Sequence, residues 1–537
     1  MAEYDCEVCV VGTGAGGGIL AHTLAMAGID VVSLEQGPAL PDDQFTRLTP
    51  PDGGDTLGIG PDTVWPSDPH DSLFIHPLFA DGRAGSTARR PGAFQHFQIL
   101  ALNGLQNLWN GVSVRFSPED MRGWPIDYAT LEPHYGAVEE LITVCGTREN
   151  LPELPDGHYV PPKPLRPADR IIVDAVRSLR EPHSHAIPNR KAINTRAGTP
   201  HSCVSTGICT SGCPVGAVYK FSVRLLPTIA GRPNYRLRTG TKVVRLLAED
   251  DGARVTAVEY LDVASGERHR LRARYVVLAA GAVETPRILF NSADDRHPGG
   301  LANHGDQLGR RLQDNPKVVL STSLYKLWGK HRDYDIGYGD LLILLSRGRL
   351  PDGSEFPFIG HAIHGIPTTP HYLGSMRLFS TGLKDRLSRA MFHSYLTLGL
   401  FCAGDPVPGN RVRPGDTLDA WGVPQVDIDF AIPGRAHQQM DAMMDWGRKV
   451  LRRASATLYH TTRDNSGTGI HYAGTTAMSG GADAGVVDAD LKAHGLDNLY
   501  VCDGGVVPVL PDKHLTLTIM ALAHRLGGHL AQRLRAA

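Results

Sequence analysis

The first 35 residues of the chain carry the feature that most limits how it can fold. An apolar stretch, Cys6–Val11, leads through a glycine-rich turn into a helix of small apolar residues, and a second apolar stretch ends at Glu35. This order of strand, glycine turn, helix, strand and acid is typical of a dinucleotide-binding unit on a parallel sheet. In such a unit Gly12 permits the tight turn, Gly14 lets backbone amides approach a pyrophosphate, and Gly17 lets the helix pack on the strand. The helix N-terminus attracts the phosphates, and Glu35 is placed to accept a hydrogen bond from a ribose hydroxyl.

Two histidines near the C-terminus are candidates for proton transfer. His471 precedes the small residues Ala473–Thr475, whereas His514 follows the turn Pro511–Lys513 and precedes a stretch, Leu515–Leu526, that predicts a helix. Two imidazoles brought to one place can take the proton of a hydroxyl and stabilise the alkoxide that forms. The chain has 24 histidines, so either residue could instead be an ordinary surface or core histidine.

Both ends of the chain together resemble the glucose–methanol–choline (GMC) oxidoreductases, which use FAD. Three internal segments extend the resemblance: Leu102–Gly111 is similar to the part that passes the flavin ring, Trp124–Tyr135 to the part after it, and Tyr275–Leu289 to the second signature of the family. The resemblance leans toward bacterial FAD-dependent sugar dehydrogenases and toward pyranose and glycoside oxidases. It implies an α/β fold of GMC type, in which a Rossmann-like FAD-binding domain is joined to a discontinuous α+β substrate domain built on an antiparallel sheet.

The resemblance also implies the roles of individual residues. His471 is the expected catalytic base and His514 its partner, at a position where many relatives carry asparagine. Leu108 occupies the position at which several relatives carry a histidine bonded to the flavin, so the FAD is expected to be non-covalent. The other residues expected to contact FAD are Asn103, Gly104, Asn110, Gly111, Val244, Ala280, Gly281, Asp503, Gly504, Leu515 and Thr516.

The expected domains follow from the resemblance and from sequence patterning. Residues 318–325 alternate as an antiparallel strand does, and Arg435–Ser455 has the apolar spacing of an amphipathic helix. Residues 38–100 are rich in Pro, Gly, Asp and His, and we expect an excursion over the cofactor that serves as a lid or an oligomer contact. The FAD-binding domain is assigned to residues 1–37, 101–135, 200–317 and 465–537, and the substrate-binding domain to residues 136–199 and 318–464.

Three cysteines, Cys203, Cys209 and Cys213, lie close together in the segment His201–Pro214. The segment resembles one in the FAD subunits of bacterial glucose, fructose and gluconate dehydrogenases, where three cysteines hold an iron–sulfur cluster. A zinc site would need a fourth ligand such as His201, and the spacing is not a standard zinc pattern. Three cysteines alone do not decide between a cluster, zinc and plain thiols.

Composition limits the partners of the protein. A formal net charge of −2 argues against nucleic acid, and no apolar run approaches the ~18 residues that a transmembrane helix needs. The chain starts without the basic and apolar segments of a signal peptide, and several of its eight cysteines lie in expected strands as reduced thiols do. We therefore expect a cytoplasmic protein whose partners are a small substrate and O2 or another electron acceptor. A homo-oligomer, or a small or cytochrome subunit, stays open.

Three functions remain compatible with the sequence. The first is an FAD-dependent oxidase that converts a CH–OH group of a sugar or glycoside to a carbonyl, with sterols or simple alcohols as alternative substrates. The second is the FAD subunit of a sugar dehydrogenase complex, which passes electrons through an iron–sulfur cluster to a partner. The third is a flavoprotein without redox activity, used as a lyase or binding module, and the presence of both His471 and His514 argues against it.

Overall fold

The computed structural model describes most of the chain. The excursion expected at residues 38–100 lies largely outside the described residues, so its role stays a prediction, as do the domain limits. The described residues are 4–40, 84–87, 94–205, 209, 213, 215–249, 252–330, 341–363, 379–391, 394–463, 467 and 469–536.

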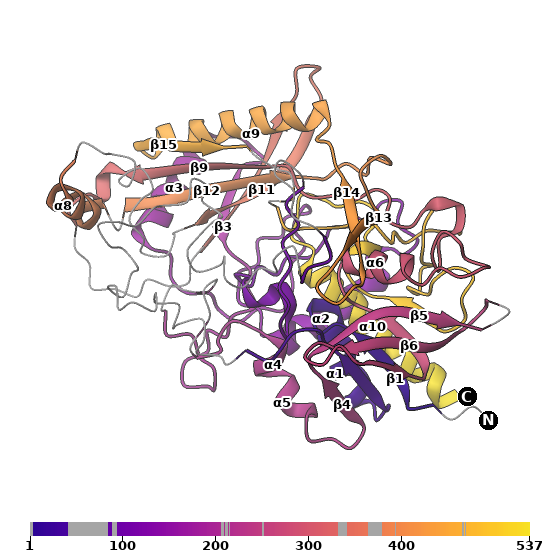
Figure 1. Ribbon diagram of the computed structural model, residues 1–537. Helices are drawn as coiled ribbons and strands as arrows, with labels where there is room; N and C mark the ends of the chain where they lie inside the picture. Colours follow the sequence, from indigo (N-terminus) through magenta and orange to yellow (C-terminus); the bar gives the residue numbers. More distant parts are fainter. Residues whose placement is uncertain are drawn as a thin grey trace.

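A five-stranded parallel sheet forms the part of the molecule in which both chain ends lie (Figure 1). Every residue of the strand Val31–Leu34 is buried, and so is every residue but Glu7 of the strand Cys6–Val11. This is the pattern of parallel sheets that are covered on both faces. Val8 lies between Val31 and Tyr275 of the neighbouring strands. In order across the sheet, the strands are β16 (Leu499–Val501), β8 (Ala273–Leu278), β1 (Cys6–Val11), β2 (Val31–Leu34) and β4 (Tyr235–Arg238).

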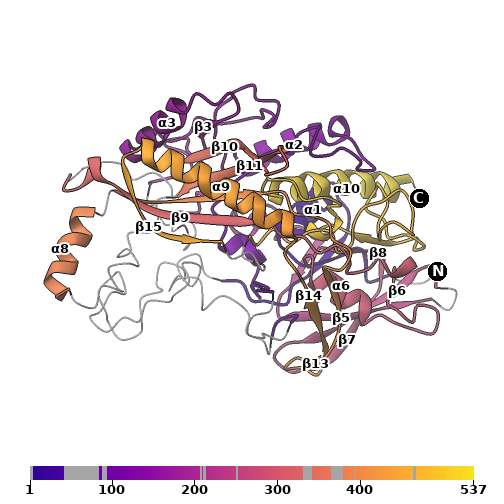
Figure 2. The ribbon, with the colours of Figure 1, turned by 90° about the horizontal axis from the view of Figure 1, so that it is seen from above.

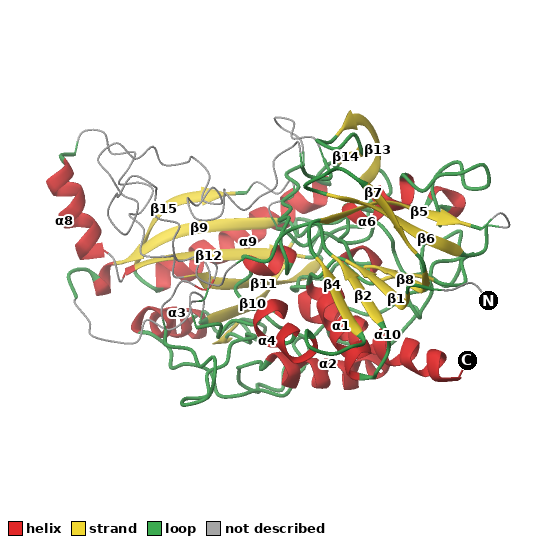
Figure 3. Ribbon diagram, turned by 60° about the horizontal axis from the view of Figure 1, so that its bottom comes forward, coloured by secondary structure: helices red, strands yellow, loops and turns green. Residues whose placement is uncertain are grey.

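Three helices lie together beside this sheet: α1 (Ala15–Met26), α10 (Thr516–Ala536) and α2 (Tyr128–Ile142) (Figure 3). Helices α1 and α10 approach closely because a glycine faces a small side chain: a Cβ atom at Gly527 would lie 2.7 Å from Cγ2 of Thr23. Small residues at the contact between the first and last helices of the chain thus bring its two ends together.

A six-stranded antiparallel sheet forms the other part of the molecule, and the long helix α9 (Gly434–Arg453) lies along one face of it (Figures 1 and 2). Because side chains alternate along a strand, Phe358 packs on the side of α9, whereas Ile359 faces the opposite side. In order across the sheet, the strands are β15 (Ala456–Thr462), β9 (Lys317–Leu324), β12 (Tyr395–Cys402), β11 (Glu355–Ile363), β10 (Leu342–Arg349) and β3 (His185–Pro188).

Two smaller sheets and several short helices complete the described structure. One sheet contains β5 (Thr241–Ala248), β6 (Val255–Asp262) and β7 (Arg268–Leu271), and the other contains β13 (Arg411–Leu418) and β14 (Pro424–Asp429). The remaining helices are α3 (Pro167–Ser178), α4 (Phe221–Arg224), α5 (Leu226–Ile229), α6 (Glu284–Phe290) and α8 (Thr381–Met391), with short 3-10 turns at Gly104–Asn107, His304–Asp306, Tyr325–Leu327 and Gly504–Val506.

The structure confirms the elements expected from local patterning, with shifted ends. The amphipathic helix expected at Arg435–Ser455 is α9. The helix expected at Leu515–Leu526 is α10, which continues to Ala536 because Leu530 and Leu534 still bury apolar side chains. The combination of a parallel nucleotide-binding sheet with an antiparallel sheet is the expected fold class.

Candidate functional site

A cavity of about 490 Å³ lies between the two large sheets. Its walls include the carboxyl ends of β1 and β2, at Val11 and Leu34, and Ala279 directly after β8, where open parallel sheets bind their ligands. At its other end it reaches Lys317 at the start of β9. The cavity therefore connects a nucleotide-binding sheet edge with the antiparallel sheet.

The glycine turn after β1 forms one wall of this cavity. Gly12 has a φ of +93°, a conformation that favours glycine, and a Cβ atom at Gly17 would lie 1.9 Å from the carbonyl oxygen of Gly12. Helix α1 begins at Ala15 with no side-chain cap and no acidic residue in its first turn. Its unpaired N–H groups and positive dipole end are thus available to an anion.

Two buried carboxylates hold the loops around the cavity. Glu35 accepts hydrogen bonds from the backbone N–H and the hydroxyl of Thr13, at 3.1 and 2.6 Å, and from the backbone of Gly37. Asp503 accepts from the hydroxyl of Thr285 at 2.6 Å and from the backbone of Gly281 at 3.0 Å. Burial raises the pKa of both carboxyl groups. Through its hydrogen bonds with Gly281 and Thr285, Asp503 joins the second signature segment to the C-terminal loop.

Most of the residues expected to contact the cofactor line the cavity. Val244 does not: its side chain packs with Leu261 and Val423, and Val243 lines the cavity in its place. Sequence patterning could not set the phase of this strand, because valine occupies both positions. Gly17 and Gly111 also lie outside the lining. Those that line it are Gly12, Gly14, Glu35, Asn103, Gly104, Asn110, Ala280, Gly281, Asp503, Gly504, Leu515, Thr516, His471 and His514.

The structure brings His471 and His514 together. Their ring centroids are 4.6 Å apart, and the ring planes meet at 73°. The backbone of His471 donates a hydrogen bond to Oδ1 of Asp314 at 2.9 Å, and Gly469 donates to Oδ2 at 2.8 Å. His514 lies two residues before the start of α10. A buried carboxylate thus holds the loop of one imidazole, and a helix end holds the other.

Three residues that patterning did not identify complete this part of the site. The ring of Phe401 lies 5.5 Å from His471 and 5.0 Å from His514, and the ring of His361 lies 4.8 Å from His514. Asn315 contacts Nδ1 of His471 through its Oδ1 at 2.7 Å. Phe401 and His361 belong to strands. The alternation of side chains along a strand predicts that these two are buried, but not which residues of other elements they contact. The polar run Gln313–Asn315 before a strand was the only available signal for Asn315.

Both imidazoles are neutral at pH 7. Burial, followed by the positive charge of Lys317, lowers the pKa of His471 to about 3. Burial and the neighbouring imidazole of His471 lower the pKa of His514 well below its usual value. Burial raises the pKa of the Asp314 carboxyl to about 6. A neutral imidazole can accept a proton, which is the property a general base needs.

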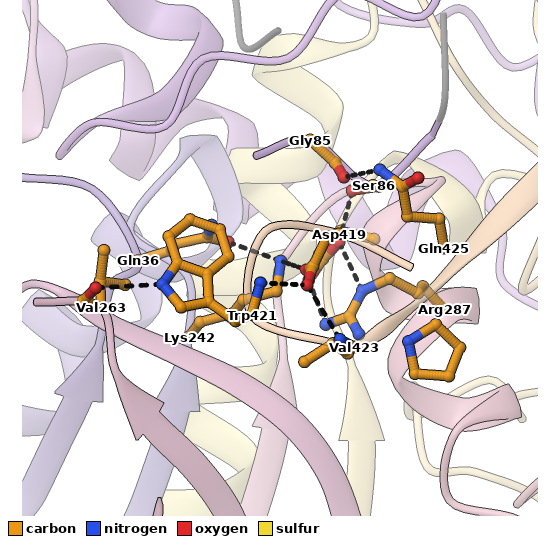
Figure 4. A network of polar contacts seen from close by, with 12 residues as sticks. Gln36, Gly85, Ser86, Lys242, Val263, Arg287, Asp419, Trp421, Val423 and Gln425 are labelled. Carbon is orange, nitrogen blue, oxygen red and sulfur yellow. Dashed lines mark hydrogen bonds and ion pairs between the residues drawn. The ribbon is translucent and has the colours of Figure 1, made fainter. Parts of the chain in front are cut away.

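A buried polar network lies beside the end of the cavity lined by Gln36 and Glu284 (Figure 4). Lys242 pairs with Asp419 at 3.0 Å, and each side chain is only 1 % exposed. Arg287 pairs with Glu284. Burial opposes ionisation of Glu284, but the charges of Arg287 and Lys242 lower its pKa to about 2. The network is therefore a compact set of paired charges.

The same network fastens the β13–β14 ribbon. Asp419 accepts hydrogen bonds from the backbones of Trp421 and Val423, both at 2.9 Å. Gln425 donates to the carbonyl of Gly85 at 2.8 Å (Figure 4). Because Lys242 belongs to β5, its ion pair with Asp419 joins the ribbon to the sheet of β5–β7.

The three cysteines of the His201–Pro214 segment lie around one apolar cluster. Cys209 is part of the cluster, and Cys203, Cys213 and Trp109 pack against it. The backbone of Ala217 donates to Sγ of Cys213 at 3.1 Å. In the described ranges, no three histidine, cysteine or carboxylate side chains converge as ligands for a metal ion. An iron–sulfur cluster stays an untested alternative.

Comparison with known proteins identifies the family. Two models described as GMC oxidoreductase match the chain, one at residues 189–317 and the other at residues 406–523. The chain belongs to the GMC oxidoreductase family. It is 29% identical to paromamine 6'-oxidase from Streptomyces fradiae, over 97% of this chain and 90% of that protein. It is 25% identical to the fructose dehydrogenase large subunit from Gluconobacter japonicus, over 97% of each. The crystal structure of pyridoxine 4-oxidase from Mesorbium loti has the same fold, with a TM-score of 0.63 at 17% identity and coverage of 99% and 100%.

Members of the GMC family bind FAD, and the cavity of this GMC protein fits that cofactor. An uncapped helix N-terminus at Gly14 suits the pyrophosphate, and the cavity continues from there past Asn103 to the paired imidazoles. The protein is an FAD-dependent oxidoreductase that acts on alcohol groups. Within the parts of the chain that can be described, no helix has the length and apolar character needed to cross a membrane.

Proposed function

We propose that this GMC enzyme oxidises a CH–OH group of a sugar or glycoside to a carbonyl, with His471 as the base and His514 as its partner. When bound, FAD supplies the acceptor for the hydride that leaves the alcohol carbon. The observation that carries the proposal is the pair of neutral, partly buried imidazoles that lie side by side in the lining of the cofactor cavity.

The two histidines have different surroundings, which supports different roles. Nδ1 of His471 is engaged by Asn315, so Nε2 on the opposite side of the ring is the nitrogen that can take the substrate's hydroxyl proton. His514 is 4.6 Å from His471 and can hydrogen-bond to the same oxygen as negative charge develops there. Lys317, which also lines the cavity, adds a positive charge that favours the alkoxide over the imidazolium.

The substrate class rests on the relatives. Paromamine 6'-oxidase and the fructose dehydrogenase large subunit are named for the oxidation of sugar-containing molecules. Each aligns with nearly the whole of this chain, which supports a substrate of the same class.

Anaerobic absorption spectra of the purified protein, recorded before and after addition of fructose or a phenolic glycoside, test the proposal. We expect flavin bands that one of these sugars bleaches and that air restores. An iron assay on the same sample separates the oxidase from the dehydrogenase subunit, since about three iron atoms per flavin with slow recovery in air would establish the latter. Bleaching by simple alcohols or sterols but by neither sugar would contradict the proposed substrate class.

The FAD is expected to be released when the protein is precipitated with acid. Leu108 lines the cavity, and by the family resemblance it stands where several relatives carry a histidine bonded to the flavin; an alkyl side chain cannot form that bond. All flavin absorbance should therefore remain in the supernatant. Flavin retained in the washed pellet would show a covalent bond to another residue.

The rate of FAD reduction at saturating sugar should stay constant from pH 8 down to about pH 5. His471 remains neutral in this range because burial lowers its pKa to about 3, and it gains its proton only as the pH falls toward that value. An imidazole with the usual pKa of about 6.5 would be about 97% protonated at pH 5. Anaerobic stopped-flow absorbance measures this rate, and a fall with a midpoint near pH 6.5 would exclude a base with a strongly lowered pKa.

A further inference from the structure

Asn315 makes three side-chain hydrogen bonds next to the proposed site, one of them to His471. It lies just before β9, and its side chain is fully buried. Its Nδ2 donates to the carbonyl oxygens of Cys402 at 2.7 Å and Pro511 at 2.8 Å. Its Oδ1 lies 2.7 Å from Nδ1 of His471. One amide thus contacts three separate segments of the chain.

The two carbonyl contacts determine how this amide is oriented. A backbone carbonyl can only accept a hydrogen bond, so the NH2 group of Asn315 must face Cys402 and Pro511. The reverse orientation would bring an oxygen against both carbonyls. Oδ1 therefore faces His471, and because Oδ1 also only accepts, Nδ1 of His471 must carry the hydrogen. A neutral imidazole carries one N–H, so its lone pair is at Nε2.

We propose that Asn315 is a positioning residue that holds His471 as the Nδ1–H tautomer and so leaves Nε2 as the proton acceptor. The inference about tautomer rests on the hydrogen bonds alone, and its consequence for catalysis rests on the proposed function of His471.

Asn315 also couples the two histidine segments. Pro511 lies three residues before His514, and Cys402 follows Phe401, whose ring contacts both imidazoles. A shift of the amide would therefore disturb the tautomer of one histidine and the placement of the other together. We therefore expect a change at Asn315 to lower the rate constant of FAD reduction rather than the affinity for the substrate.

The tautomer can be measured directly on the wild-type protein with bound FAD. In protein labelled with 15N in the histidine rings, NMR distinguishes a protonated ring nitrogen from one with a lone pair, and the His471→Gln variant identifies the signals of His471. We expect a protonated Nδ1 and an unprotonated Nε2 near pH 7. The opposite pattern would overturn the proposal without any further variant.

Two variants of Asn315 separate positioning from simple structural support. Asn315→Leu has a similar volume and no polar atoms, and we expect it to lose the preference for the Nδ1–H tautomer. Its rate of FAD reduction should fall about 10- to 100-fold, with FAD content unchanged. Asn315→Asp keeps an acceptor for His471 but loses the donor to the carbonyls of Cys402 and Pro511, so it should retain the tautomer and recover only part of the rate. It should also move the acid limb of the pH profile toward neutral pH, because a carboxylate favours the imidazolium.

The outcomes distinguish this inference from the proposed function. An Asn315→Leu protein whose His471 signals and pH profile match the wild type would overturn the positioning role, even if His471 proves essential. Conversely, a fully active His471→Ala variant would remove the base while the tautomer assignment stands. If Asn315→Leu does not fold, the wild-type signals and the pH profile of Asn315→Asp still decide the question.

Discussion

Replacing His471 with alanine should slow the reduction of bound FAD by its alcohol substrate at least about 100-fold. The substitution removes the group that takes the hydroxyl proton, and no described carboxylate contacts its ring. Asp314 is not placed to replace it, because Asp314 does not line the cavity and contacts His471 and Gly469 through their backbone N–H groups. Anaerobic stopped-flow absorbance with saturating substrate isolates this step from reoxidation.

The control for this experiment is His437→Ala. His437 is exposed on α9, outside the cavity lining, and its loss should leave the rate unchanged. FAD content and melting temperature of His471→Ala should remain close to those of the wild type, since the backbone contacts to Asp314 do not depend on the side chain. A His471→Ala protein that reduces its flavin at the wild-type rate would eliminate His471 as the base.

Replacing Lys242 with methionine should destabilise the protein by about 3 kcal/mol, because it leaves the buried Asp419 carboxylate without its counter-charge. Both side chains of this pair are 1 % exposed, so water cannot compensate. Glu284 also loses the attraction of Lys242 but keeps its pairing with Arg287. The loss corresponds to a fall in Tm of about 3 °C if all 537 residues unfold together, and to a larger fall if a smaller unit unfolds alone. Differential scanning calorimetry of the FAD-loaded protein measures it.

Two further variants test the electrostatic explanation. Asp419→Asn should cost less than Lys242→Met, since Lys242 still has Glu284 nearby and the new amide oxygen could still accept from the backbones of Trp421 and Val423. The double variant should be more stable than Lys242→Met alone, because no buried carboxylate is left unpaired. Arg349→Met, which breaks the exposed pair with Glu355, should change Tm by about 1 °C or less. Equal losses in Lys242→Met and the double variant would mean that packing, not charge, explains the effect.

The local elements of this fold could be predicted because their signals lie in short stretches of sequence. The glycine turn at Gly12, the apolar strand before it and the amphipathic spacing of α9 each depend on neighbours within a few residues. The structure has all three at nearly the expected positions. The resemblance to a family could likewise point to His471 and His514, because they lie in motifs with distinctive neighbours.

The contacts between elements could not be predicted in the same way. Asn315 is 156 residues from His471 in the sequence, and Phe401 reaches both imidazoles only because β12 pairs with β9 in one particular register. Whether Val243 or Val244 faces the cavity depends on the phase of β5, which a run of two identical residues leaves open.

Sequence patterns and motifs were enough to establish the nucleotide-binding unit, the two sheet types and the two candidate histidines of this GMC oxidoreductase. The folded chain was needed to show that the ring centroids of the two histidines lie 4.6 Å apart, that both rings are partly buried and neutral, and that one amide contacts both of their segments. This division arises because periodicity and turn chemistry act over a few residues, whereas burial, pKa and hydrogen-bond direction depend on side chains that only the folded chain brings together.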